Sequence, residues 1–407
     1  MYALNATGGR AAGNASWRLV ATAVDAARAA ICVPLIAREL GVAGYGAWSV
    51  VATIIALLHP LAIGGSTSTL VREVVRDGTH AHALLASARR MRISLAVCAV
   101  PVAALVAGVL GGDLAACAAA VVAFGLLCEA MATSSVVLAA GLRDDLGAIA
   151  RVLGSIAATV GVAVVVRCDL GLVGIAAATL AGVATTSVVA WTLAHPLMPG
   201  PAARPRCDRE VGFGIVALTW PIALSSLFAA ALLLGDVALV NVLAGPSESG
   251  VLGACGRVLA IGVALPAAIS AALVPVLSIR RKDALALTRR AAWTAAVVGT
   301  AGGAAITVMA PLVGRMLGHG FEGTRALLPI IGLRVAIASV NAPWSALLLA
   351  LRGQHAILAI QAATFACSIC AMLVVVPRYG AVGAAWIGVA GELTCTVLQA
   401  RAARRRV

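Results

Sequence analysis

The chain alternates long apolar runs with short polar turns, and this pattern restricts it to a membrane-embedded helical fold. Hydrophobic residues fill 62% of the 407 positions, and only 11% are charged. A run of about 20 apolar residues crosses a hydrocarbon core of about 30 Å as an α-helix. The sequence shows no alternating ten-residue pattern typical of an outer-membrane barrel. It therefore predicts an all-α polytopic membrane protein.

The runs predict twelve spanning helices in two groups of six. The first half, residues 1–196, would form one lobe, a linker would cover 197–211, and residues 212–407 would form the second lobe. A polar connection is expected at 66–91. The predicted spans lie near 17–37, 46–65, 92–111, 114–138, 147–166, 171–193, 212–234, 251–274, 291–313, 327–349, 355–376 and 380–400.

The charge distribution predicts the orientation. The net charge is +14, but the arginines stand in short loops and at helix ends, which argues against nucleic-acid binding. With the N-terminus inside, 20 basic residues fall on the cytoplasmic side and five on the outer side. Cytoplasmic loops carry the excess of Lys and Arg. Both termini are therefore expected in the cytoplasm, and the first apolar run is expected to be a spanning helix rather than a cleaved signal peptide.

The two halves echo one another. Gly41 and Gly46 recur as Gly245 and Gly250 at an offset of 204 residues. A second echo, at an offset of 209, relates residues 169–177 to 378–386. Six spans per half is an even number, so both halves enter the membrane with the same polarity. The repeat then predicts two related bundles about a pseudo-two-fold axis along the membrane normal, with a substrate path between them.

Several motifs in this order resemble bacterial polysaccharide and O-antigen flippases. These oligosaccharide flippases belong to the multidrug/oligosaccharidyl-lipid/polysaccharide exporter superfamily, with the multidrug and toxin extruders and the lipid II flippases. The resemblance extends over nearly the whole chain, whose length fits the twelve-helix oligosaccharide flippases. The motifs are Ala37-Arg38-x-Leu40-Gly41-x-x-x-Tyr45-Gly46, Pro221, Asp236, Gly245-Pro246-x-x-x-Gly250, Arg257, Pro266-Ala-Ala-Ile-Ser-Ala-Ala-Leu-Val-Pro275 and Gly380-x-x-Gly383-Ala-Ala385.

The resemblance implies a fold and a function. It implies a V-shaped pair of six-helix bundles, as in the multidrug and toxin extruders, that alternates access between the two sides of a bacterial cytoplasmic membrane. It also implies that the substrate is an undecaprenyl-pyrophosphate-linked oligosaccharide for cell-surface polysaccharide. A polysaccharide polymerase and the export machinery would be partners, and the chain would not be an enzyme.

Ionisable residues within the spans are the candidate site residues, because each costs about 2.5–3.5 kcal/mol on insertion scales. Arg18, Asp25 and Arg28 share the first helix, and the step from Asp25 to Arg28 allows a pair on one face. Arg18 and Arg28 would attract pyrophosphate through their guanidinium forks. Alternatively, Arg18 reaches the cytoplasmic surface and Asp25–Arg28 is a structural pair.

Arg257 and Arg334 are the candidate substrate contacts of the second half. Arg257 would hold the substrate from the opposite wall, or anchor lipid near the outer interface. Arg334 has no partner in its own predicted helix, which favours a role facing a cavity.

Asp236, Glu129 and Glu392 are candidates for ion coupling or for pairing with arginines. The resemblance implies a proton or sodium site near Asp236. The eleventh predicted helix, however, carries no carboxylate, only Gln361, Thr364 and Ser368 among its polar candidates, which weakens the case for sodium. Pro221 and Gly235 would let the seventh helix bend, either during transport or as a static kink.

Other functions fit the sequence less well. A cation-coupled exporter of drugs would favour an aromatic cavity, yet aromatic residues make up 4% of the chain. A membrane polymerase, ligase or glycosyltransferase would need catalytic residues on a substantial loop. No Walker A sequence occurs, and Asp144-Asp145, which looks like a metal-binding pair, is expected to lie in a solvated cytoplasmic turn. The scattered cysteines, including the C-x-x-C at Cys367 and Cys370, are expected to be small apolar side chains.

Overall fold

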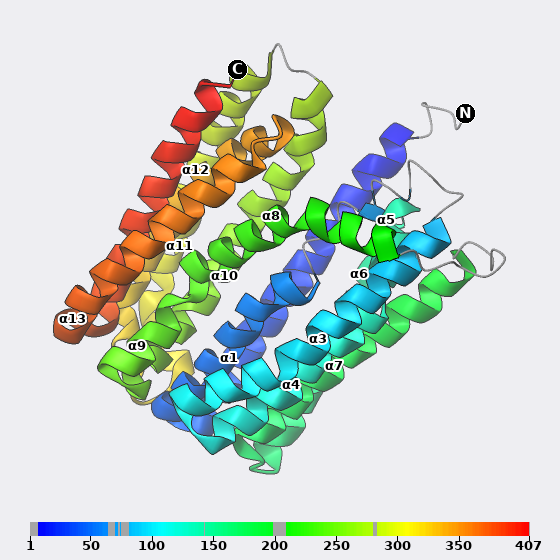
Figure 1. Ribbon diagram of the computed structural model, residues 1–407. Coiled ribbons are helices and arrows are strands. Elements are labelled where there is room, and N and C mark those ends of the chain that lie inside the picture. Colours follow the sequence, from blue (N-terminus) through cyan, green and yellow to red (C-terminus); the bar gives the residue numbers. More distant parts are fainter. Residues whose placement is uncertain are drawn as a thin grey trace. The chain divides into compact units, whose positions relative to one another are not determined.

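The computed structural model describes residues 7–63, 70–71, 74, 81–141, 143–197, 209–279 and 283–406. All regular elements in these ranges are helices, and no strand occurs among them, which confirms the predicted all-α fold (Figure 1). Most of the predicted linker 197–211 and part of the connection 66–91 lie outside the described residues. The elements are α1 (Thr7–Ala62), α3 (Ala81–Gly111), α4 (Asp113–Met131), α5 (Ser134–Ala140), α6 (Asp144–Arg167), α7 (Gly171–Ala194), η1 (His195–Leu197), α8 (Arg209–Leu234), α9 (Asp236–Ala244), α10 (Pro246–Ile279), α11 (Ala284–Leu317), α12 (Thr324–Ala350) and α13 (Gln354–Arg404).

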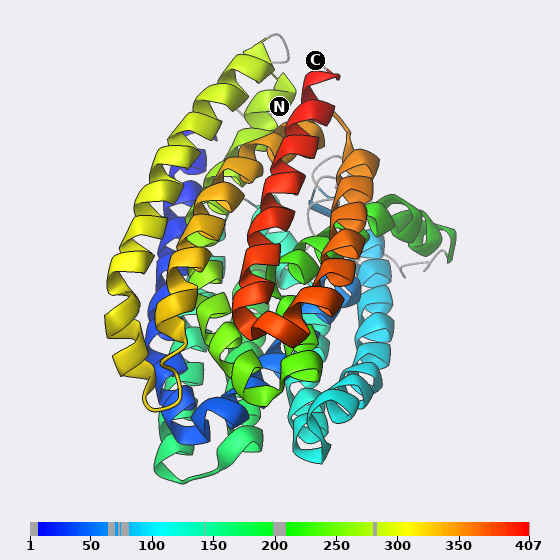
Figure 2. The ribbon, with the colours of Figure 1, turned by 90° about the vertical axis from the view of Figure 1, so that its left-hand side faces the viewer.

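Two of these helices are folded back at a glycine. Gly41 in α1 has φ 67° and ψ 178°, and Gly380 in α13 has φ 54° and ψ −141°. Positive φ is easily adopted by glycine, which has no Cβ, so the chain can reverse at these points. We call residues 354–379 the first arm of α13 and residues 381–404 its second arm. The arms run side by side, and the second returns toward the end where the first began (Figures 1 and 2).

The folded helices bring the number of spans to the predicted twelve. Among the described residues, nine helices are long and apolar enough to cross a membrane, or ten when α8 and α9 are counted as one bent span. A straight 51-residue helix such as α13 would measure about 77 Å, more than twice the hydrocarbon thickness. α1 and α13 therefore each supply two spans, giving a multi-pass membrane protein.

One predicted span is broken. The sequence predicts a continuous helix over 114–138, but α4 ends at Met131 and α5 begins at Ser134. Ala132 has φ −92° and ψ 75°, which is outside the helical region. Thr133 and Ser134 follow, and such residues compete for backbone hydrogen bonds and lower helix propensity. Thr133 and Ser134 lower the local hydropathy only slightly, so the hydropathy pattern does not reveal the break.

The described chain forms two compact units that do not follow its two sequence halves. One unit comprises Met1–Cys32 and Leu58–Leu224, in which α6 packs on α7 and α4 packs on both α3 and α7. The other comprises Val33–Leu57 and Ser225–Val407, in which α12 packs on α10, α11 and α13. The division into lobes at 1–196 and 212–407 stays a prediction.

The repeated glycines explain why Val33–Leu57 joins the second unit. A Cβ on Gly46 would lie 2.7 Å from Ser249 Oγ and 2.9 Å from the carbonyl carbon of Pro246. A Cβ on Gly250 would lie 3.1 Å from the carbonyl carbon of Val42. Val42 and Pro246 each precede their glycine by four residues, so the two copies of the motif contact each other reciprocally. Small residues allow such close backbone approach in membrane helices.

The turn of α13 is tied to the same region. Glu248, in the first turn of α10, accepts a hydrogen bond from the backbone N–H of Ala381 at 2.9 Å. That amide follows the Gly380 reversal and lacks an intrahelical partner at a helix start. The second copy of the repeated motif therefore anchors the hairpin that carries several candidate site residues.

The outward faces of several helices are apolar. Val109 on α3, Val308 and Trp293 on α11 are each 75–79% exposed. Exposed apolar faces of this kind would be unfavourable in water and suit contact with lipid. They agree with a membrane location for both units.

Candidate functional site

The candidate site is built on a break between α8 and α9. The helix axis bends by 47° between Leu234 and Asp236, at Gly235, whereas Pro221 lies within continuous α8. The Asp236 carboxylate accepts a hydrogen bond from the backbone N–H of Val237 at 3.0 Å. The break interrupts the helical hydrogen-bond ladder, so neighbouring groups must satisfy the backbone carbonyls before it.

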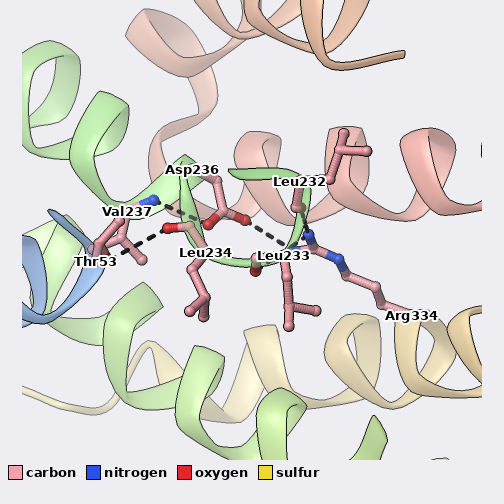
Figure 3. A network of polar contacts seen from close by, with 7 residues as sticks. All are labelled: Thr53, Leu232, Leu233, Leu234, Asp236, Val237 and Arg334. Carbon is pink, nitrogen blue, oxygen red and sulfur yellow. Dashed lines mark hydrogen bonds and ion pairs between the residues drawn. The ribbon is translucent and has the colours of Figure 1, made fainter. Parts of the chain in front are cut away.

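Arg334 on α12 fills this break (Figure 3). Its Nη1 lies 2.9 Å from Asp236 Oδ2, and its Nη2 donates to the carbonyls of Leu232 and Leu233. The side chains of Arg334 and Asp236 are 1% and 4% exposed. A carboxylate with several carbonyl oxygens is the ligand set that hard cations prefer. Here the guanidinium of Arg334 serves as the cation.

Two further contacts complete the geometry. Thr53 Oγ1 lies 3.5 Å from the carbonyl oxygen of Leu234, so the part of α1 after Gly41 contacts the break as well. A Cβ on Gly388, in the second arm of α13, would lie 2.6 Å from Arg334 Cζ. The guanidinium therefore packs directly on the backbone of α13, and a side chain at Gly388 would displace it.

Glu392 lies one turn beyond Gly388 and faces the same region. The positive charge of Arg334 acts on its carboxylate, and the Asn341 side chain on α12 hydrogen-bonds to it. Among the ion pairs of the described residues, none includes Glu392. Three candidate residues, Asp236, Arg334 and Glu392, are thus brought together, and Asp236 and Arg334 form a buried ion pair.

The first-helix residues are arranged differently from the expected pair. Asp25 accepts a hydrogen bond from Ser155 Oγ on α6 at 3.0 Å, and among the described ion pairs none joins it to Arg28. Arg28 is half-buried. Arg18 lies on α1, but its side chain falls outside the described part of the structure.

The two remaining candidates also have partners. Glu129 Oε2 on α4 lies 2.9 Å from His59 Nε2 on α1. Arg257 on α10 hydrogen-bonds to the hydroxyl of Tyr45, whose ring packs edge-to-face on Phe321 with centroids 5.8 Å apart. Tyr45 is 1% exposed and belongs to the first glycine motif. These two pairs are not part of the cluster around Arg334.

Several of these partners were missed at the level of the sequence. His59, Tyr45 and Asn341 do not belong to the Asp, Glu, Lys and Arg residues to which the cost of burying a charge was applied, so that cost does not single them out. A usable signal exists for Asn341, which stands seven residues after Arg334, because that spacing returns to nearly the same helix face. The carbonyls of the broken helix could be expected only from Gly235 next to Asp236.

The geometry can be compared with known proteins. A family model described as "Polysaccharide biosynthesis protein" matches residues 11–279, more than half of the chain. The chain belongs to this polysaccharide biosynthesis family. No curated protein matches it in sequence.

Comparison with solved structures shows the fold of this chain. A MOP superfamily transporter from Pyrococcus furiosus, whose report describes a binding pocket of reverse polarity, has a TM-score of 0.73 at 18% identity. A multidrug resistance MATE transporter in an outward-facing conformation gives 0.70 at 18%, and a MATE in complex with MaL6 gives 0.71 at 17%. Each alignment covers 96% of this chain and 94% of the other. The fold is that of MOP superfamily transporters, as the resemblance implied.

The described residues contain no group of three or more His, Cys, Asp or Glu side chains that could hold a metal ion. Asp236 is paired with Arg334, and the charge of Arg334 also acts on Glu392. The site therefore joins two acidic side chains around one arginine.

Proposed function

We propose that the protein flips an undecaprenyl-pyrophosphate-linked oligosaccharide across the bacterial cytoplasmic membrane. The observation that carries the proposal is a match to a polysaccharide biosynthesis family in a chain with a transporter fold. The family suggests the glycan as the cargo, and the fold suggests movement rather than covalent chemistry. The two repeats would alternate access to either side, as two lobes at 1–196 and 212–407.

The substrate contacts are proposed to be Arg28, Arg257 and Arg18. A pyrophosphate is a compact dianion or trianion that guanidinium groups recognise with paired hydrogen bonds. Arg28 is half-buried on α1 and Arg257 is half-buried on α10. Arg334 is better suited to charge pairing, because Asp236 and two carbonyls already accept hydrogen bonds from its Nη1 and Nη2.

Coupling is proposed to use protons or sodium, with Asp236, Glu392, Glu129 and Asp25 as the acidic groups concerned. Arg334 occupies the oxygen ligands that a metal cation at Asp236 would need, and this favours the proton. The excess of basic residues in alternate loops supports cytoplasmic termini. A polysaccharide polymerase and the export machinery are the expected partners.

The function is tested first by deleting the gene. We expect loss of the surface polysaccharide, with lipid-linked repeats retained on the inner leaflet. Accumulation of repeats on the outer leaflet would point to polymerisation or ligation instead. Unchanged glycan with raised sensitivity to cationic drugs would favour a drug exporter and would refute the proposal.

Substitutions at Arg28 test the substrate contact. Arg28→Glu should abolish glycan export at normal protein level, because it places a negative charge where the pyrophosphate is expected. Arg28→Lys keeps the charge without the planar fork and should retain part of the export. Arg151→Glu reverses the charge of an exposed arginine on α6 and serves as the matched control. Normal export by the Arg28→Glu variant would remove Arg28 from the substrate path.

A further inference from the structure

Unpartnered polar atoms are concentrated in the interior of the second unit. Arg334 Nε, Asn341 Oδ1, Gln361 Oε1 and both amide atoms of Gln399 are buried, and the protein offers them no hydrogen-bond partner. They come from α12 and from both arms of α13. Buried polar atoms in proteins are nearly always satisfied by protein or by internal water. Five such atoms in one bundle therefore point to bound water.

The two arms of α13 place Gln361 and Gln399 at one level. A Cβ on Gly391 would lie 3.2 Å from Ser368 Oγ, and Cys395 Sγ lies 3.7 Å from Thr364 Oγ1. The two arms are therefore antiparallel, and a residue four positions later on the second arm faces a residue four positions earlier on the first arm. One more step of three or four residues brings Gln361 level with Gln399. Their carboxamides can both donate and accept, so each suits a chain of water molecules.

α12 supplies a second row along the same interface. Arg334 packs on Gly388, and Asn341 hydrogen-bonds to Glu392. α12 and the second arm of α13 therefore lie side by side in the same chain direction. Asn341 lies seven residues after Arg334, and Gln399 lies seven residues after Glu392, which keeps each pair on one helix face. We call Arg334, Asn341, Glu392, Thr364, Gln361 and Gln399 the polar tract.

The polar tract leads from the ion pair to the end of the protein that carries the C-terminus. Gln399 stands five residues before Arg404, the last residue of α13, a rise of about 7.5 Å. Arg404 stacks over the Trp344 ring at 5.4 Å from its centroid. Thr364 is 3% and Gln399 is 0% exposed, so these two side chains of the tract are enclosed by protein, whereas Asn341 and Glu392 are partly buried.

We propose that the polar tract binds a file of water molecules and conducts protons between Glu392 and the surface near the C-terminus. The proposal rests on the proposed transport function and assigns it a proton carrier and a route. Glu392 is the carrier because Asp236 is already paired with Arg334. The proton leaves the Glu392 carboxyl for the adjacent water, and each water passes one proton onward along the file. The remaining carboxylate faces Arg334 and Asn341 on α12.

The charged and titratable groups around Glu392 fit a carrier that changes between two states. Arg334 on α12 is the positive charge that acts on Glu392, and Asp236 on α9 is already paired with that arginine. Cys395 on the same helix is the neighbouring thiol, and the first arm of α13 contributes only the hydroxyls of Thr364 and Ser368. No permanent counter-charge is therefore dedicated to Glu392 within the described residues.

Water in the tract can be measured without any transport assay. Radiolytic hydroxyl-radical labelling of the full-length protein oxidises sulfur atoms that lie beside bound water. Cys395, beside the tract, and Cys255, on α10, are 2% and 1% exposed, so their burial is matched. We expect Cys395 to be labelled much faster than Cys255, and the double substitution Gln361→Leu/Gln399→Leu to bring Cys395 to the rate of Cys255. Equal labelling in the unmodified protein would overturn the proposal.

Proton conduction is measured in proteoliposomes with a pH-sensitive dye, with lipid-linked oligosaccharide as the probe. Gln361→Leu/Gln399→Leu should keep the melting temperature of the unmodified protein and lose most of the substrate-dependent proton flux. Glu392→Gln should lose it as well. Thr364→Val, on the first arm of α13, should also lower the flux, and Thr394→Val, on the exposed face of the second arm, is its control. Full proton flux in the double glutamine variant would overturn the proton route.

Different results would refute the proposed flippase function and the proposed water file. If the unmodified protein moves no lipid-linked oligosaccharide, the proposed function fails, whatever the labelling of Cys395. If it moves the substrate normally while Cys395 stays as unreactive as Cys255, the water file alone is refuted.

Discussion

The buried pair between Arg334 and Asp236 yields the sharpest prediction. Arg334→Met would remove the ion pair at 2.9 Å and the donors to the Leu232 and Leu233 carbonyls. Asp236 would keep one donor, the Val237 N–H, and remain a carboxylate without a counter-charge. Breaking a buried ion pair on one side costs about 3–5 kcal/mol. At about 2.1 cal/mol/K of unfolding entropy per residue, a loss of that size lowers the unfolding midpoint of a 407-residue chain by about 4–6 °C.

A double variant distinguishes the loss of the whole ion pair from the loss of one of its two charges. Asp236→Asn/Arg334→Gln removes both charges and keeps polar groups at both positions, so no uncompensated charge stays buried. We expect it to be more stable than Arg334→Met by about 2 kcal/mol or more, because desolvation is relieved. Thermal unfolding of the detergent-purified protein, followed by size-exclusion chromatography, measures both.

Arg325→Met is the matched control, since Arg325 is an exposed arginine at the start of the same helix. We expect its midpoint within a degree or two of the unmodified protein, as exposed charges contribute about 0–1 kcal/mol. If Arg334→Met unfolds like Arg325→Met, or if the double variant is as unstable as the sum of its single changes, Arg334 does not neutralise Asp236 in the way the geometry requires.

Three other substitutions follow from the packing. Gly388→Val should push the guanidinium of Arg334 from Asp236 and lower the melting temperature about as far as Arg334→Met, whereas Gly302→Val, with nothing within 4 Å of its Cβ, should melt normally. Gly46→Ala should cost about 1–3 kcal/mol in unfolding experiments, because its Cβ would overlap Ser249. Glu248→Ala should leave the Ala381 N–H without its acceptor and speed hydrogen exchange at that amide, which mass spectrometry of α13 peptides detects.

The sequence predicted the spans well because hydropathy measures the property that fixes them. All twelve predicted spans correspond to helical segments, since a chain in lipid must satisfy its backbone hydrogen bonds internally. The ends were less accurate. α11 begins at Ala284 instead of 291, and α3 begins at Ala81 instead of 92, because helical hydrogen bonding continues past the apolar segment that hydropathy detects.

The site was predictable as a list of residues and not as a set of contacts. The cost of burying a charge selects Asp236, Arg334 and Glu392 as candidates, and the structure places these three side chains near one another. Asp236 and Arg334 are 98 residues apart, and nothing in the local sequence says which faces of two helices meet. The same limit explains why Glu129 was identified without His59. Uncharged Gln399 is cheaper to bury, so the cost of a charge did not point to it.

The reciprocal glycine contact restricts how the protein can alternate access. Each copy of the motif packs its glycine against the backbone four residues before the glycine of the other copy, so the contact needs both backbones in place. Any motion that separates the two sequence halves must therefore either open this contact or carry Val33–Leu57 along with Ser225–Val407. Opening it exposes two backbone carbonyls, of Val42 and Pro246, and leaves Ser249 its bonds to Asn241 and the Pro246 carbonyl. Those two bonds lie within the second half, but the Tyr45–Arg257 and Thr53–Leu234 hydrogen bonds join the two halves beside the glycine contact. Carrying Val33–Leu57 along with Ser225–Val407 keeps these hydrogen bonds and the glycine packing intact, and it therefore costs less than opening the contact during a transport cycle.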